Sequence, residues 1–234
     1  MVIASKIKEE KHDGQSQFYF DVLPKATFNA LQKCAEINFF SRSKWYLAGG
    51  TALALQAGNR KSVDLDFFTE SENFNQKKIE KLLNSQGEWV TTSLSEGTLY
   101  GEFFGAKMSF IAYPFFTPSM PMRKYGTVAM VAPLDIAVMK ILAVSQRGRK
   151  RDFFDLYWIC QNVQALSQII PRVHKQYTMH QNIIHTLKSL VYFEDAESDP
   201  EPEIYFKANW NTVKKFFRKE IPIITYKIMK LKIL

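Results

Sequence analysis

The stretch Trp45–Phe68 (WYLAGGTALALQAGNRKSVDLDFF) constrains the fold most, because two β-forming segments in it enclose a glycine turn and a helix-forming run. The residues Trp45–Leu47 are aromatic or apolar β-formers, and we expect their strand to end at Gly49 and Gly50. Glycines at such a turn let the backbone come close to a ligand. The stretch therefore predicts strand, tight turn, short helix, loop and second strand, an arrangement suited to a nucleotide.

The helix-forming run is Ala52–Ala57, which is rich in Ala and Leu. Thr51 is predicted to be its N-cap, and Gly58 is predicted to be the left-handed residue after its last turn. A helix N-terminus that follows glycines presents free N–H groups and the positive end of a dipole to an anion, which suits phosphate. A strand-to-helix turn without a ligand is the alternative for so short a motif.

The second predicted strand carries two acids. Side chains alternate along a strand, so Val63, Leu65 and Phe67 share one face while Asp64 and Asp66 share the other. Two carboxylates that point the same way can hold one or two Mg²⁺ ions bridged to substrate phosphates. The alternative is an amphipathic edge strand with solvated acids. However, like charges on one face repel, and a metal would remove that conflict.

Composition limits the class of protein. The 234 residues suffice for one substantial domain or two small lobes, and no apolar run is long enough to span a membrane. We therefore expect a soluble cytoplasmic protein. Cys34 and Cys160 are read as small buried residues of a reducing compartment. The 31 Lys and Arg exceed the 23 Asp and Glu, and the net charge of +8 favours polyanions such as nucleotides or nucleic acid.

Periodicity and turn residues predict a mixed sheet with helices around it, followed by a helical second half. The predicted helices of the first half are Leu23–Phe40 and Asn75–Asn84, and the predicted strands after them are Glu88–Ser95, Thr98–Phe104, Lys107–Tyr113 and Thr127–Val131. The predicted segments of the second half are the helices Pro133–Gln146, Arg151–Gln161, Ala165–Tyr177, Met179–Tyr192 and Asn209–Lys219, an acidic loop at Glu194–Glu203 and a poorly ordered tail at Tyr226–Leu234.

Two features of the second half extend the predicted site. Lys140 lies within the apolar surround of its helix, so it must snorkel or find an anion. Asp152 and Asp155 are three residues apart and share a face of the next helix. The basic run 147–151 between these helices is either a solvated loop or a group of cations that holds a triphosphate or an RNA backbone.

At these residues the sequence resembles a known family. The segments LAGGTALALQ and NRKSVDLDFFT resemble the signature of the AbiEii/AbiGii-type nucleotidyltransferases, which are members of the DNA-polymerase-β-like nucleotidyltransferase superfamily and include many toxins of toxin–antitoxin pairs. The first motif falls on Gly49, Gly50, Thr51, Arg60, Ser62, Asp64 and Asp66. The second motif falls on Lys140, Arg151, Asp152, Asp155 and Leu156.

The resemblance implies a role for each of these residues. It implies Asp64 and Asp66 as metal ligands and catalytic acids, and Lys140 as a catalytic lysine. A further catalytic aspartate would be Asp152 or Asp155, with Asp155 preferred. The nucleotide-binding residues would be Gly49, Gly50, Thr51, Arg60, Ser62 and Arg151. The chain departs from the superfamily in one respect, because Ala106–Tyr113 lacks a third acid and Glu102 is not assigned that role.

The prediction is thus an α+β protein: a polymerase-β-like nucleotidyltransferase core in residues 1–130 with an N-terminal helix, and a helical C-terminal lobe in residues 131–234. It would move NMP from an NTP to a hydroxyl acceptor with Mg²⁺ or Mn²⁺. By the resemblance the acceptor would be RNA such as a tRNA 3′ end, and the chain would be a toxin with a cognate antitoxin protein. The alternatives are a phosphotransferase acting on a protein or metabolite hydroxyl and a degenerate module that binds nucleotide or partner without turnover.

Overall fold

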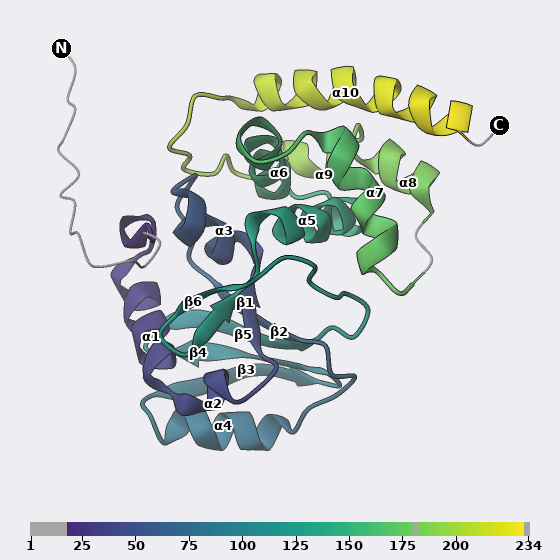
Figure 1. The fold of residues 1–234 in the computed structure, drawn as a ribbon. Helices are drawn as coiled ribbons and strands as arrows, with labels where there is room; N and C mark the ends of the chain where they lie inside the picture. The colour runs from purple at the N-terminus through teal and green to yellow at the C-terminus, as the bar shows by residue number, and fades with distance from the viewer. Residues whose placement is uncertain (1–17, 180–181, 232–234) are drawn as a thin grey trace, which may run out of the picture.

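A mixed β-sheet forms the base of the molecule (Figure 1). The computed structural model describes residues 18–179 and 182–231, and within them seven strands form one sheet in the order β3-β4-β5-β2-β1-β7-β6. The strands are β1 (Tyr46–Ala48), β2 (Leu65–Thr69), β3 (Trp89–Ser95), β4 (Thr98–Phe103), β5 (Ala106–Ala112), β6 (Arg123–Tyr125) and β7 (Val128–Met130). The predicted meander of three strands is confirmed, and it joins the acid-bearing strand through parallel pairing of β5 with β2.

The two faces of the sheet differ in polarity because side chains alternate along each strand. Leu65 and Phe67 of β2 are fully buried, and the Phe67 ring stacks on Phe110 of β5 with centroids 5.3 Å apart. Asp66 and Phe68 occupy the opposite face. One face thus carries the core of the sheet and the other carries the predicted site.

The core face is covered by α1 (Lys25–Glu36), α2 (Asn38–Ser41) and α4 (Gln76–Asn84), and the 3₁₀ turn η1 (Phe20–Val22) precedes them. The single helix predicted over Leu23–Phe40 is wrong in one detail, since the chain is extended at Ile37. There the hydroxyl of Thr127 donates to the carbonyls of Cys34 and Ile37. The segment before β7 therefore replaces helical hydrogen bonds at the break.

Helix α3 (Gly49–Ala57) begins at the first glycine, so the prediction of Thr51 as N-cap is wrong. Ala48 is the N-cap residue, and the hydroxyl of Thr51 instead donates to the backbone carbonyl of Asp64. The predicted role of Gly58 is confirmed, because it adopts a left-handed conformation with φ of 61° at the end of the helix.

The other face of the sheet is covered by the helical second half, in which α5 lies between the sheet and the remaining helices (Figure 1). These helices are α5 (Pro133–Arg147), α6 (Lys150–Asn162), α7 (Leu166–Gln176), α8 (Ile183–Ser189), α9 (Glu194–Glu197) and α10 (Trp210–Leu231). Helix α5 packs against α3, α6, α7 and α8. It is therefore the central helix of this half.

Two predictions for the second half need correction, and one strand of the sheet was missed. The acidic loop at Glu194–Glu203 contains α9, and the tail predicted from Tyr226 is helical through Leu231. Helix α10 continues because its buried residues keep helical spacing past Phe217 to Ile221 and Ile224. The strand β6 was missed, since three residues give little periodic signal. Predictions for residues 1–17, for His180 and for residues 232–234 lie outside the described residues.

The observed architecture confirms the predicted fold class, a mixed sheet flanked by helices with a helical second half. In the described part of the chain, none of the helices has the length and apolarity that crossing a membrane requires. A boundary between lobes near residue 130 stays a prediction, and a hydrophobic core that runs from the sheet into the helices is continuous across it.

Candidate active site

The two acids of the predicted motif lie at the start of β2. Asp64 precedes the strand and Asp66 is its second residue, so only Asp66 is fixed by sheet pairing. The prediction that Val63 shares the buried face is wrong, because Val63 precedes the strand and is 45% exposed. Its carbonyl accepts a hydrogen bond of 2.8 Å from Thr27, which holds this segment against α1.

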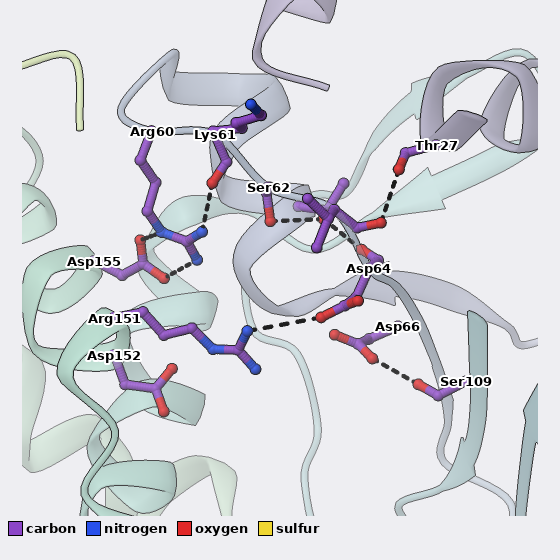
Figure 2. Close-up of polar contacts among 12 residues, drawn as sticks. Thr27, Arg60, Lys61, Ser62, Asp64, Asp66, Ser109, Arg151, Asp152 and Asp155 are labelled. Carbon is purple, nitrogen blue, oxygen red and sulfur yellow. Dashed lines mark hydrogen bonds and ion pairs between the residues drawn. The ribbon is translucent and has the colours of Figure 1, made fainter. Parts of the chain in front are cut away.

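Asp66 is paired in register with Ser109 of the neighbouring strand β5. The Ser109 hydroxyl donates to Asp66 Oδ1 at 2.7 Å, as Figure 2 shows. A hydroxyl therefore stands beside Asp66 at the place where a third carboxylate could have stood. Glu102, which the sequence analysis did not assign to the site, is exposed on β4. Two carboxylates rather than three face the site.

The turn into α3 lies directly against these acids. A Cβ atom on Gly49 would lie 3.0 Å from Asp66 Oδ2, and Gly49 also has a φ of 71°. A Cβ atom on Gly50 would lie within 3.0 Å of the Arg60 guanidinium. Both glycines are thus required by close approach of charged side chains, and the first N–H groups of α3 remain beside the acids.

A buried ion network stands behind this turn. Asp155 of α6 is fully buried and accepts hydrogen bonds from Arg60 Nε at 2.7 Å, Arg60 Nη2 at 2.8 Å and Asn59 at 3.0 Å. Lys140 Nζ lies 2.9 Å from Asp155 Oδ2 and also pairs with Asp152. The predicted anion for Lys140 is therefore supplied by α6, and Lys140 does not snorkel.

This network fixes the charge state of Asp155. Burial alone raises the pKa of its carboxyl group, but the charges and hydrogen bonds of Arg60 and Lys140 outweigh burial and hold the pKa well below its ordinary value. Asp155 is thus ionised, and four donors surround its two oxygens. A carboxylate in that state is a poor proton acceptor.

A cavity of about 300 Å³ lies between the sheet face and α5. Nine of the eleven predicted site residues line it, whereas Asp152 and Asp155 do not. The nine are Gly49, Gly50, Thr51, Arg60, Ser62, Asp64, Asp66, Lys140 and Arg151. The two acids of α6 lie behind cations that line the cavity, since Asp155 pairs with Arg60 and Lys140 and Asp152 pairs with Lys140 and Arg147.

The cations of the cavity are held to different degrees. The side chains of Arg60 and Lys140 are nearly buried, at 6% and 7% exposed. Arg151 is half-exposed, and its guanidinium lies 3.7 Å from Asp64 Oδ2 (Figure 2). Arg147 is also exposed, with Nε 3.7 Å from Asp152. Arg147 and Arg151 are therefore the cations that can turn toward an anionic ligand.

The acids fit a divalent cation. Burial raises the pKa of Asp66, and the nearby charge of Asp64 raises it further, while Ser109, Lys140 and Arg151 oppose the shift. A cation between the two carboxylates would relieve both the burial and the repulsion. No cluster of three or more His, Cys, Asp or Glu side chains that could hold a metal occurs among the residues described.

Sequence reasoning missed some residues that line the cavity or support the residues that do. Ser109 is polar within an apolar strand, but its partner becomes known only with the register of β5 on β2. Asn59 was seen only as part of a loop motif, although its side-chain amide is buried against Asp155. The apolar lining of the cavity was also missed, and it consists of Phe68, Tyr100, Ile111, Tyr113, Ile136, Met139 and Ala143.

Comparison with known proteins assigns this architecture to a family. Residues 34–98 and 106–225 match the family described as nucleotidyl transferase AbiEii toxin, type IV TA system. The uncharacterized protein aq_aa25 of Aquifex aeolicus is 35% identical over 208 residues, which span 85% of this chain and 96% of that protein. The nucleotidyltransferase toxin MenT4 of Mycobacterium tuberculosis shares the fold, with a TM-score of 0.51, 14% identity and 86% of each chain covered.

The family match includes both sequence motifs and the strands and helices that bring them to one cavity. The chain is therefore a nucleotidyltransferase that belongs to the AbiEii toxin family.

Proposed function

We propose that this enzyme transfers NMP from an NTP to a hydroxyl group of RNA, such as a tRNA 3′ end, with the help of Mg²⁺ or Mn²⁺. The observation that carries the proposal is the arrangement of Asp64 and Asp66 on one wall of a cavity that also receives the N-terminus of α3 and the cations Lys140 and Arg151. Acids for a cation and N–H groups and cations for phosphates are the parts that phosphoryl transfer requires.

Asp64 and Asp66 would hold the divalent cation. When bound there, the ion would neutralise charge on the triphosphate. The hydrogen bond from Ser109 keeps one oxygen of Asp66 engaged and leaves Oδ2, the oxygen beside Gly49, directed at the turn. We assign the phosphate contacts to the N–H groups at the start of α3, to Arg151 and to the hydroxyl group of Ser62, which Thr51 contacts at 2.8 Å.

Lys140 is proposed to offset negative charge that develops on the transferred phosphoryl group. We propose that Asp152 and Asp155 position Lys140, in place of the acceptor-activating role expected from the sequence. Their burial behind Lys140 and the donors that surround Asp155 support this change. Contacts with two carboxylates hold the Lys140 ammonium group in place beside the cavity.

Labelled nucleotides test the proposal against its alternatives. The purified protein is incubated with α- or γ-labelled NTPs, Mg²⁺ and total RNA. Label from the α position in RNA is expected. Label from the γ position alone, on protein or metabolite, would instead establish a phosphotransferase, and no transfer with retained NTP binding would establish a degenerate binding module.

Substitution of a cavity acid provides the control. Asp64→Asn is expected to lower transfer at least about 100-fold, because one oxygen ligand of the cation loses its charge. Its side chain is partly exposed, so circular dichroism should show an intact fold. Glu102→Gln changes the same charge at an exposed position of β4 outside the cavity and should leave the rate unchanged. Equal rates for Asp64→Asn and wild type would remove Asp64 from the site.

We further propose that the enzyme acts in the cytoplasm and is paired with a cognate antitoxin protein, as the family description suggests. Induced expression should then arrest growth of a bacterial host, whereas expression of Asp64→Asn should not. Co-expression of a small regulator from the neighbouring reading frame should restore growth. Growth arrest by both wild type and Asp64→Asn would show that toxicity does not depend on the transfer activity.

A further inference from the structure

The cavity has a second, apolar half that the proposed chemistry does not use. Its wall on the sheet consists of Phe68 from β2, Tyr100 from β4, and Ile111 and Tyr113 from β5 or just after it. These four residues are called the aromatic patch below. The opposite wall is the face of α5 that carries Ile136 and Met139.

We propose that the aromatic patch binds the nucleobase of the NTP by stacking on its face. This inference rests on the proposed use of an NTP and assigns the part of the nucleotide that the phosphate-binding residues leave unbound. Aromatic side chains stack on every base, because every base has a π-face. Apolar residues of α5 line the same cavity, so this part of it suits a flat, uncharged group.

Sheet register places the patch at the right point relative to the acids. Asp66 pairs with Ser109, and two residues further along both strands Phe68 pairs with Ile111. A step of two residues advances about 6.6–6.8 Å along a strand and returns to the same face. The polar pair Asp66 and Ser109 and the apolar pair Phe68 and Ile111 are therefore neighbours on one face of the sheet. A ribose separates phosphate from base in any nucleotide, so a base site must begin a short way from the carboxylates.

Neighbouring aromatic rings hold part of the patch in place. The Phe68 ring stacks on Tyr46 with an interplanar angle of 19° and meets Tyr113 edge to face with centroids 5.6 Å apart. The hydroxyl groups of Tyr113 and Tyr177 lie 3.1 Å apart, and Tyr177 is buried. Rings that are fixed before the ligand arrives lose little conformational entropy on binding. Tyr100 at the rim is 39% exposed and free of such packing.

Binding measurements without RNA test the inference. Affinities for each of the four NTPs and for inorganic tripolyphosphate are measured by titration calorimetry with Mg²⁺. Tyr100→Ala and Phe68→Leu are expected to weaken NTP binding about 5- to 150-fold, the range given by stacking on one aromatic ring. Tripolyphosphate binding should stay unchanged, because the phosphate contacts lie at the other end of the cavity.

Two controls keep the result specific. Tyr192→Ala removes a tyrosine that is 53% exposed outside the cavity, and it should bind NTPs as wild type does. Phe68→Leu keeps most of the side-chain volume over Tyr46, and circular dichroism verifies its fold. Ribose 5-triphosphate, which has no base, should bind wild type and Tyr100→Ala equally.

Other outcomes would overturn the inference. Variants that bind NTPs like wild type but raise the KM for RNA would assign the patch to the acceptor. Equal loss of NTP and tripolyphosphate binding would show that the patch supports the cavity as a whole. Wild type that binds tripolyphosphate but no NTP would overturn the proposed function together with the base site, whereas NTP binding unchanged in the variants would overturn the base site alone.

Discussion

Asp155 shows how much a single side chain contributes to this site. It lies in α6, is fully buried, and joins a loop residue, Arg60, to a helix residue, Lys140. Removal of one partner from a buried ion pair leaves the other charge without compensation. The residue thus links the two motifs that the sequence separates by some ninety positions.

Asp155→Asn is expected to lower the free energy of unfolding by about 3–5 kcal/mol, the range for a broken buried pair. Urea denaturation at pH 7 measures the change. The matched control is Glu203→Gln, which removes the exposed pair with Lys61 and should cost less than about 1 kcal/mol. A loss for Asp155→Asn no greater than that of the control would contradict a buried network.

The same residue predicts a dependence on pH. The folded state holds the pKa of Asp155 below its ordinary value of 3.8, so its stabilising effect is complete above that value and declines as the pH falls further. The difference in unfolding free energy between wild type and Asp155→Asn should therefore be largest near pH 7. It should shrink progressively below about pH 4. Denaturation at pH 7, 5 and 3 tests this, and a difference that grows toward acid pH would reverse the assignment.

At the scale of the element, helix propensity and close packing have opposite effects at the start of α3. Gly50 is helical and carries no positive φ, so Ala there would be favoured by helix propensity by about 1 kcal/mol. The space for a Cβ atom, however, is occupied by the Arg60 guanidinium. The glycine is present because the ion network passes directly over the helix.

Gly50→Ala is therefore expected to destabilise the protein, against its helix propensity, and to reduce transfer. A double-mutant cycle with Arg60→Ala tests the cause, because without the guanidinium the nearest contact of the added methyl group is Ser62 Oγ at 3.3 Å. In the Arg60→Ala background, Gly50→Ala should be neutral or stabilising by urea denaturation. Equal destabilisation in both backgrounds would place the conflict elsewhere.

Elements were predictable where their signals were local. Alternation and glycine turns predicted the three-stranded meander, and Pro133 with the apolar run after it predicted α5. The start of α3 and the length of α10 were not predictable, because both depend on partners distant in sequence. Thr51 bonds to the carbonyl of Asp64 rather than capping its helix, and α10 is sustained by residues that bury against other helices.

At the scale of the whole molecule, the site was predictable as a set of residue types and not as an arrangement. The motifs named Asp64, Asp66, the two glycines and Lys140, which line one cavity. They did not reveal that Asp155 lies behind that cavity, that Ser109 bonds to Asp66 or that Phe68 lines the cavity. Those placements depend on the register of β5 on β2 and on the packing of α6, and local sequence determines neither of them.

The two halves of the chain share one core and one ion network, so we expect them to unfold together. Trp45 and Trp89 report on the sheet, and Trp158 and Trp210 report on the helical half. Two variants are made, each of which keeps one pair of tryptophans and carries Phe at both positions of the other pair. In each variant the urea transitions measured by fluorescence and by far-UV circular dichroism should coincide. Separate midpoints would reveal two independent lobes.

The alternation of polar and apolar rows on the sheet has a consequence for how such enzymes diversify. Asp66 and Phe68 are neighbours on one strand, yet we assign the first to the reaction and the second to binding of the base. Exchanges at Phe68, Ile111 or Tyr100 leave the carboxylates and their supporting ions untouched. Related enzymes can therefore differ in how tightly they hold the base while they keep the same chemistry.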